Sequence, residues 1–154
     1  MRLSQVDGER LWLQLRPGEK RLLVEVLQLY PLVDTAYHRA THSADPRVDQ
    51  KLLEEALAAL KQENQDRLRV FLDLPQRFQE TKNGWRLMVE IQDVEWLLQV
   101  VNDIRVGSWL KLGMPDERSE EKLALSQGHV RYLVAMEWSG LLEGLLLEGR
   151  AQAP

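Results

Sequence analysis

The sequence predicts a mainly α fold: a bundle-like single domain of four or five helices with a small β-hairpin at its N-terminus. Most apolar residues recur every three or four positions, the spacing of a buried helix face. Proline and glycine end these patterns at several points. Strand-like alternation is confined to the first fifteen residues and one later segment. The chain has 154 residues, enough for one hydrophobic core.

We expect one domain, residues 1–150, followed by a flexible tail, residues 149–154. The two ranges overlap because the exact end of the domain is not defined by the pattern. Within the domain, residues 1–15 form the hairpin and residues 17–148 the helices. Asp7-Gly8 is a preferred two-residue hairpin turn, and leucines alternate with other residues from Leu11 to Leu15. An isolated hairpin is only marginally stable, so we expect it to lean on the helices.

The first helix is expected to begin at Pro17. Its apolar stripe keeps the same phase as far as Ala40, across Pro31. Because an internal proline removes a helical hydrogen bond, this pattern predicts one kinked helix or two stacked ones. A second helix is expected to start at Asp45-Pro46, with the aspartate as N-cap, and its stripe ends at Phe71.

The segment after Leu74-Pro75 is expected to hold a short helix that carries Phe78. Asn83-Gly84 either ends that helix or makes a turn. Residues Trp85–Ile91 allow two interpretations. They alternate like a strand, but they could also extend the next helix backward.

The central helix, Trp96–Leu112, combines a strong apolar stripe with an arginine, Arg105, among the apolar positions. Apolar residues on its far side predict that it is covered on more than one flank. A guanidinium at this position must be paired or solvated, because burying it without a partner would cost several kcal/mol. Glu137 is the best-phased partner, with Asp34 and Glu55 as alternatives. The helix is expected to end at Gly113.

The last helix is expected to begin at the cap Ser119-Glu120-Glu121. Its predicted core stripe is Leu123, Val130, Leu133, Val134, Trp138, Leu141, Leu142 and Leu145. Tyr132, Met136 and Leu146 are then surplus apolar side chains that face elsewhere. Such residues cover another helix, pack a homodimer, or bind a different protein.

Composition narrows the classes of function. The net charge is −4 with basic and acidic residues interleaved, which argues against nucleic acid as the main partner. There are no cysteines, so disulfides and thiolate chemistry are excluded. Charged residues interrupt every apolar stretch, and the N-terminus lacks the apolar core of a secretory signal. We therefore expect a cytoplasmic protein with no membrane partner.

Two groups of polar residues are candidate sites. Asp34, His38 and His42 are spaced one helical turn apart, so they could bind zinc or another divalent cation, with His129 as a possible third imidazole. The simpler interpretation is a solvated helix face. We predict no catalytic residues: no nucleophile elbow or phosphate-binding loop is present.

The second group is Asn102, Asp103 and Arg105 in the central helix, which could bind a ligand or partner. The structural alternative is that Arg105 ties two helices together through a carboxylate, which suits its fork of donors.

The same region carries a family resemblance. Trp96-Leu97, the run Val101-Asn102-Asp103-Ile104-Arg105-Val106 and then Leu112-Gly113-Met114 resemble an uncharacterised family of small bacterial proteins. In actinobacteria, members of that family are typically encoded near the ClpS protease adaptor. The resemblance implies a mostly helical domain of unknown activity linked to proteolysis or amino-acid metabolism. This chain departs from the family pattern at Trp109, usually glycine, and at Lys111, usually arginine.

From these observations we expect a non-enzymatic protein-protein interaction domain that needs no cofactor and binds a protein partner or a second copy of itself. Asn102, Asp103, Arg105, Tyr132 and Met136 are the expected binding residues. The alternative is a metal-dependent helical-bundle enzyme that uses Asp34, His38 and His42.

Overall fold

The computed structural model describes residues 1–37, 46–116 and 128–153. In chain order the elements are β1 (Arg2–Asp7), β2 (Arg10–Leu15), α1 (Glu19–Leu27), the short 3-10 helix η1 (Thr35–Tyr37), α2 (Pro46–Asp73), β3 (Phe78–Thr81), β4 (Gly84–Glu90), α3 (Ile91–Lys111) and α5 (Val130–Gln152). The mainly helical class is confirmed, but the β part is larger than a hairpin.

The strands form one antiparallel sheet in the order β1-β2-β4-β3. The N-terminal hairpin is confirmed: Asp7 pairs with Arg10 across the turn. The ambiguous segment after Gly84 is strand β4, which pairs with β2 so that Leu13 lies opposite Leu87. The leucines of β2 and β4 thereby face one side of the sheet, where they form part of the hydrophobic core.

The short helix expected around Phe78 is wrong. Phe78 begins strand β3 and lies opposite Leu87. Thr81 pairs with Gly84 across a tight turn, where Gly84 has φ +134° and lies too close to the Leu15 carbonyl for a side chain. Such a turn favours glycine and brings two short segments together, and pairing with an existing sheet outweighs weak helical propensity over four residues.

The first helix is also shorter than expected. It ends at Leu27 and does not continue to residue 40. Pro31 explains the end, because its ring would collide with the carbonyl oxygen of Leu27 in a continued helix. Tyr30 and Val33 are nevertheless buried, so the apolar pattern correctly identified core residues while the backbone is not helical there.

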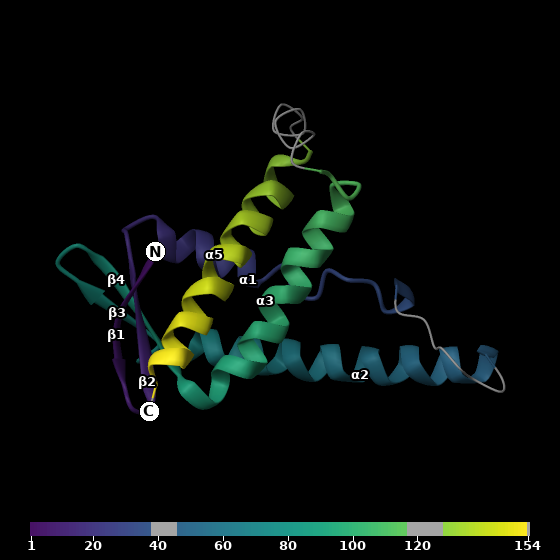
Figure 1. Ribbon diagram of the computed structural model, residues 1–154, viewed down its shortest axis with the longest axis horizontal. Helices are drawn as coiled ribbons and strands as arrows, with labels where there is room; N and C mark the ends of the chain where they lie inside the picture. The colour runs from purple at the N-terminus through teal and green to yellow at the C-terminus, as the bar shows by residue number, and fades with distance from the viewer. Residues whose placement is uncertain (38–45, 117–127, 154) are drawn as a thin grey trace.

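The helices cover the sheet on one side. α3 and α5 run antiparallel next to each other, and α2 crosses them at one end (Figure 1). The C-terminal part of α2 reaches the core through Leu68 and Phe71, which are 3% exposed. The N-terminal part of α2 extends away from the body of the protein (Figure 1). The helix expected from Pro46 to Phe71 is confirmed, whereas the expected N-cap Asp45 lies outside the described residues.

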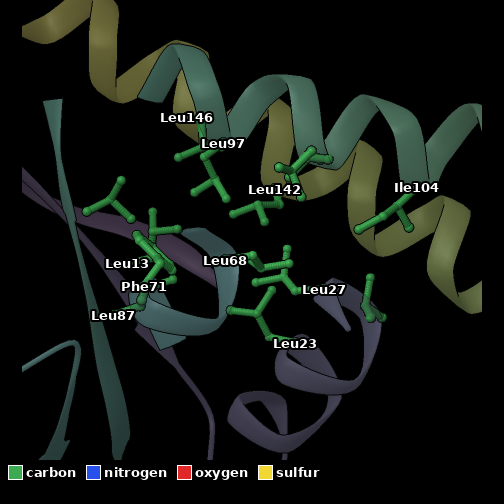
Figure 2. Packing of buried hydrophobic residues seen from close by; sticks show 14 of the residues in the cluster. Leu13, Leu23, Leu27, Leu68, Phe71, Leu87, Leu97, Ile104, Leu142 and Leu146 are labelled. Atoms are coloured by element: carbon green, nitrogen blue, oxygen red, sulfur yellow. The ribbon is translucent and has the colours of Figure 1, made fainter. Parts of the chain in front are cut away.

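The core lies where α1, α3, α5, the end of α2 and the sheet meet (Figure 2). Leu97 and Ile104 of α3 are fully buried there. Leu142 and Leu146 of α5 point toward them (Figure 2). Burying a leucine side chain stabilises a fold by about 1.5–3 kcal/mol, so this cluster supplies most of the apolar stabilisation.

The predicted core stripe of the last helix is correct only in part: Leu142 is buried, and Trp138 and Leu145 pack against the core. The structure buries Ala135, Ser139, Leu142, Leu146 and Gly149. Leu146 was expected to be a surplus surface residue but is fully buried, and Leu141 was expected in the core but is 45% exposed. Much of the buried face of this helix consists of the small residues Ala, Ser and Gly. A pattern based on large apolar residues does not include them, so it could not locate this face correctly.

The last helix extends into the segment that is expected to be a flexible tail. α5 continues to Gln152, and Gly149 packs on Leu11 so closely that a Cβ would lie 3.0 Å from Leu11 Cδ2. The expected start of the last helix at Ser119 lies outside the described residues, and in the described part α5 begins at Val130.

A polar cluster lies inside the core between α2, α3 and the segment that follows α1. Asn64 Nδ2 donates to Tyr30 Oη at 3.3 Å, and Trp96 Nε1 donates to Asn64 Oδ1 at 3.1 Å. Burial raises the pKa of Tyr30, and the negative charge of Asp103 raises it further, while the bond from Asn64 acts in the opposite direction. The cluster satisfies polar groups that would be costly to bury alone.

Arg77 is a buried arginine in the loop between α2 and β3. Its side chain is 2% exposed and stacks on Phe71, with the guanidinium carbon 3.8 Å from the ring centroid. Nε donates to the Phe71 carbonyl at 3.0 Å and one terminal nitrogen donates to the Met88 carbonyl at 2.7 Å. Burial lowers the pKa of Arg77, and the charges of Asp93 and Glu90 act against that decrease.

Two buried hydroxyls lie on the paired helices. Ser108 of α3 and Ser139 of α5 are at most 1% exposed, and neither Oγ has a hydrogen-bond partner among the described residues. Among the helices in the described ranges, none has both the length and the apolar character needed to cross a bilayer.

Candidate binding groove between α3 and α5

Arg105 is exposed and also paired, so the expectation that a guanidinium in the apolar stripe must be paired or solvated is confirmed. Its side chain is 45% exposed, and Nε lies 3.1 Å from Glu143 Oε2 on α5. A terminal nitrogen also donates to Asn102 Oδ1 at 3.3 Å. The arginine does tie α3 to α5 through a carboxylate, but the partner is Glu143 and the expected partner Glu137 is exposed.

The reason lies in how α3 is covered. Both its predicted stripe and its far side, including Trp96 and Val100, are buried, so the expectation of cover on more than one flank is confirmed. A single apolar arc does not define the buried face of such a helix. Arg105 lies at the border of the α5 contact, where its stem can pack and its guanidinium reaches water.

Arg105 lines a hollow of about 300 Å³ together with Val106, Trp109 and Met136. Arg105, Val106 and Trp109 come from two consecutive turns of α3, and Met136 comes from α5. The structure therefore brings together two residues that the sequence identified separately, Arg105 and Met136. We call these four residues the α3–α5 groove.

Trp109 is held in place from the end of its own helix. Its Nε1 donates to the Pro115 carbonyl at 3.1 Å, and the Met114 amide donates to the Trp109 carbonyl at 2.9 Å. Gly113 has φ +80° and Met114 φ +58°, so the chain turns back sharply after the helix. The turn fixes a 37% exposed indole at the edge of the groove.

On the α5 side, Met136, Gly140 and Glu143 share one helix face by their spacing. A Cβ built on Gly140 would meet nothing within 4 Å, so packing does not require glycine there. A glycine inside a helix costs about 1 kcal/mol relative to alanine. Its lack of a side chain leaves open space between Met136 and the Arg105–Glu143 ion pair.

Tyr132 lies one turn before Met136 on the same face and is half-buried. The guanidinium carbon of Arg131 is 6.0 Å from the Tyr132 ring centroid. Tyr132 is not among the residues that line the hollow, so it lies next to the groove and is not part of it.

Asp103 is separate from this groove and has a structural role. Its Oδ1 accepts a hydrogen bond from the Leu32 amide at 2.6 Å and one from the Val33 amide at 3.3 Å. Its Oδ2 lies 3.6 Å from Lys61 Nζ, which also donates to the Val33 carbonyl. The expected binding role of Asp103 is therefore not supported by its position, since both oxygens are used inside the protein.

The metal alternative falls largely on residues that the structure does not describe. His38 and His42 lie outside the described ranges. Asp34 is exposed, and its Oδ1 accepts the Ala36 amide at 2.8 Å at the start of η1. Within the described residues no group of three histidine, aspartate or glutamate side chains could hold a metal ion.

Comparison with protein-family models, with curated proteins and with solved structures finds no match to this chain.

Proposed function

We propose that this chain is a protein-interaction domain whose α3–α5 groove binds a segment of a partner protein. The observation that carries the proposal is the hollow of about 300 Å³ lined by Arg105, Val106, Trp109 and Met136. Tryptophan and arginine dominate the binding energy of many interfaces, and methionine is common in them because it adapts to varied partners.

The groove suits one large apolar side chain next to an acidic group. Val106, Trp109 and Met136 provide apolar surface, and the hollow has room for a side chain of the size of leucine or phenylalanine. The Arg105 guanidinium has five N–H donors, and Glu143 and Asn102 do not use all of them. A carboxylate of the partner can therefore pair with Arg105 at the rim.

The walls of the groove are preformed. α3 and α5 are packed along most of their length, and ion pairs Glu95–Arg150 and Arg105–Glu143 join them at two levels. A rigid site loses little conformational entropy on binding, which favours affinity. The family resemblance makes components of regulated proteolysis, including the ClpS adaptor, the first partners to test.

The test is a selection of binding peptides from a random library displayed on phage, with the full chain as bait. We expect selected peptides to combine an apolar residue with Asp or Glu nearby. Met136→Glu should weaken their binding at least about tenfold, because it places a desolvated charge in the groove. Arg105→Ala should weaken chiefly the acidic peptides.

Leu141→Glu is the matched control. Leu141 is a 45% exposed leucine on another face of α5, so the same type of change there should leave peptide binding unaltered. Circular dichroism establishes that each variant is folded. Peptides that bind Met136→Glu as well as wild type, or a library that yields no binder, would contradict the proposal.

A further inference from the structure

The N-terminal half of α2 exposes apolar side chains at a place where the helix has left the body of the protein (Figure 1). Val48 is 53% exposed and Leu52 is 58% exposed, and Ala56 and Ala59 are also exposed. These four residues fall within an arc of about 80° on an ideal helix. We call them the α2 stripe.

The order of residues in the α2 stripe is informative. The two large side chains, Val48 and Leu52, come first, and the two small ones, Ala56 and Ala59, follow. In a parallel pair of such helices, leucine would meet leucine and alanine would meet alanine, which leaves one end crowded and the other hollow. In an antiparallel pair, large side chains face small ones at both ends.

From this pattern we infer that the α2 stripe binds the α2 stripe of a second copy of this chain, antiparallel and with two-fold symmetry. An axis between residues 53 and 54 places Leu52 against Ala56 of the second copy and Val48 against Ala59. Two-fold symmetry repeats each contact, as in other isologous dimers. Small residues let antiparallel helices approach closely, so the leucine fills the space that alanine leaves.

The charges on the flank of the stripe fit the same pairing. Lys51 and Glu55 lie one turn apart beside the stripe, with Nζ and Oε1 3.9 Å apart in the same chain. The axis that matches large to small also brings Lys51 of one copy toward Glu55 of the other, twice. Glu54 lies on the opposite side of the helix, so the pairing does not bring its charge close to its own symmetry copy.

This inference is independent of the α3–α5 groove, which lies on other helices. Sedimentation velocity and light scattering of the full chain, from about 1 μM to about 1 mM, should show a change from monomer to dimer mass. Leu52→Glu should remove the dimer, with a loss of affinity of about 100-fold or more. Val70→Glu is the control: Val70 is 64% exposed on the same helix but lies beyond the paired segment.

A charge exchange tests the register. Lys51→Glu or Glu55→Lys alone should weaken the dimer by about tenfold, because each replaces two attractive contacts by repulsive ones. The double variant Lys51→Glu/Glu55→Lys should restore the affinity of the wild type. It also restores the ion pair within each chain, so melting curves at low concentration separate helix stability from association.

The direction of the pairing is tested by cross-linking, since the chain has no native cysteine. A mixture of Val48→Cys and Ala59→Cys chains should form the mixed disulfide dimer under mild oxidation more readily than either variant alone. Cross-linking of Val48→Cys to itself would instead indicate a parallel pair, because the antiparallel pairing places the two copies of residue 48 about 16 Å apart along the helices, and it would overturn the proposed arrangement.

A wild-type chain that stays monomeric at the highest concentration and gives no mixed disulfide would overturn self-association. The stripe would then be left for a different protein. A dimer that survives Leu52→Glu but not Met136→Glu would place the interface at the α3–α5 groove and would also overturn the inference.

Discussion

The carboxylate of Asp103 and the ammonium of Lys61 lie 3.6 Å apart, and each also binds the backbone of the segment between α1 and η1. Their side chains are only 13% and 12% exposed. One ion pair therefore connects α3, α2 and an irregular segment that has no secondary structure to hold it.

The first prediction concerns this pair. Asp103→Ala should lower the free energy of unfolding by about 3 kcal/mol, because it leaves Lys61 and two backbone amides without their partner. Lys61→Met should cost less, since the apolar stem is retained. Urea denaturation of both single variants and the double variant measures the coupling, and a coupling energy near zero would contradict the structural role of the pair.

The second prediction compares two helical glycines. Gly107 of α3 has no room for a methyl group, because a Cβ would overlap the side chain of Leu32. Gly107→Ala should therefore destabilise the fold by about 1–3 kcal/mol. At Gly140 a Cβ meets nothing, so Gly140→Ala should stabilise by up to about 1 kcal/mol. The melting temperature should therefore fall in Gly107→Ala and rise in Gly140→Ala. A Gly107→Ala variant as stable as wild type would contradict the close approach of residues 32–33 to α3.

The third prediction is a pH dependence caused by Tyr30. Burial raises the pKa of Tyr30 above its ordinary value of 10.0. Its contribution to stability is therefore complete below about pH 10, and it decreases as the pH rises above 10 because the unfolded chain ionises first. In Tyr30→Phe this part of the alkaline loss should disappear. The difference between the wild-type and variant unfolding free energies, measured from pH 8 to 11, should decrease with pH; a constant difference would contradict the burial of the phenol.

The fourth prediction concerns Arg77. Arg77→Ala removes donors from the Phe71 and Met88 carbonyls and opens a space beside Phe71, so it should cost about 3 kcal/mol. Lysine cannot reproduce two donors in the fixed planar arrangement, and Arg77→Lys should recover only a fraction. Equal stability of Arg77→Lys and wild type in urea would indicate that the guanidinium geometry is unimportant.

The fifth prediction is that Arg105→Ala has a small effect on stability. An exposed ion pair such as Arg105–Glu143 contributes at most about 1 kcal/mol, far below the cost expected for a buried arginine. Chemical denaturation measures this directly. A loss above about 3 kcal/mol would show that the side chain is buried after all.

Some elements can be predicted from a single local feature of the sequence, such as a turn dipeptide or a glycine at the end of a helix. Asp7-Gly8 identified the hairpin, and Gly113 identified the end of α3 within two residues. Strand β3 was missed because only four residues pair there, and Phe78 becomes a strand residue through its partner Leu87, which no local pattern contains.

The candidate site was predicted in part. Arg105 and Met136 were identified from their own helices, and the structure places them in one groove. In the sequence Trp109 is only a departure from a family pattern, and the signal that could have added it to the site is its position one helical turn after Arg105. The role of Asp103 could not be predicted, because its partners are backbone amides about 70 positions away and leave no trace in side-chain pattern.

Ser108 and Ser139 place buried polar groups on the two helices that form the groove. Ser108 lies between Arg105 and Trp109 along α3, and Ser139 lies between Met136 and Glu143 along α5. Both hydroxyls are buried, and neither has a hydrogen-bond partner among the described residues. Each such group offsets about 1–3 kcal/mol of the attraction between the two helices. The apolar contacts between α3 and α5 and their two ion pairs must therefore hold the walls of the groove in place against this cost.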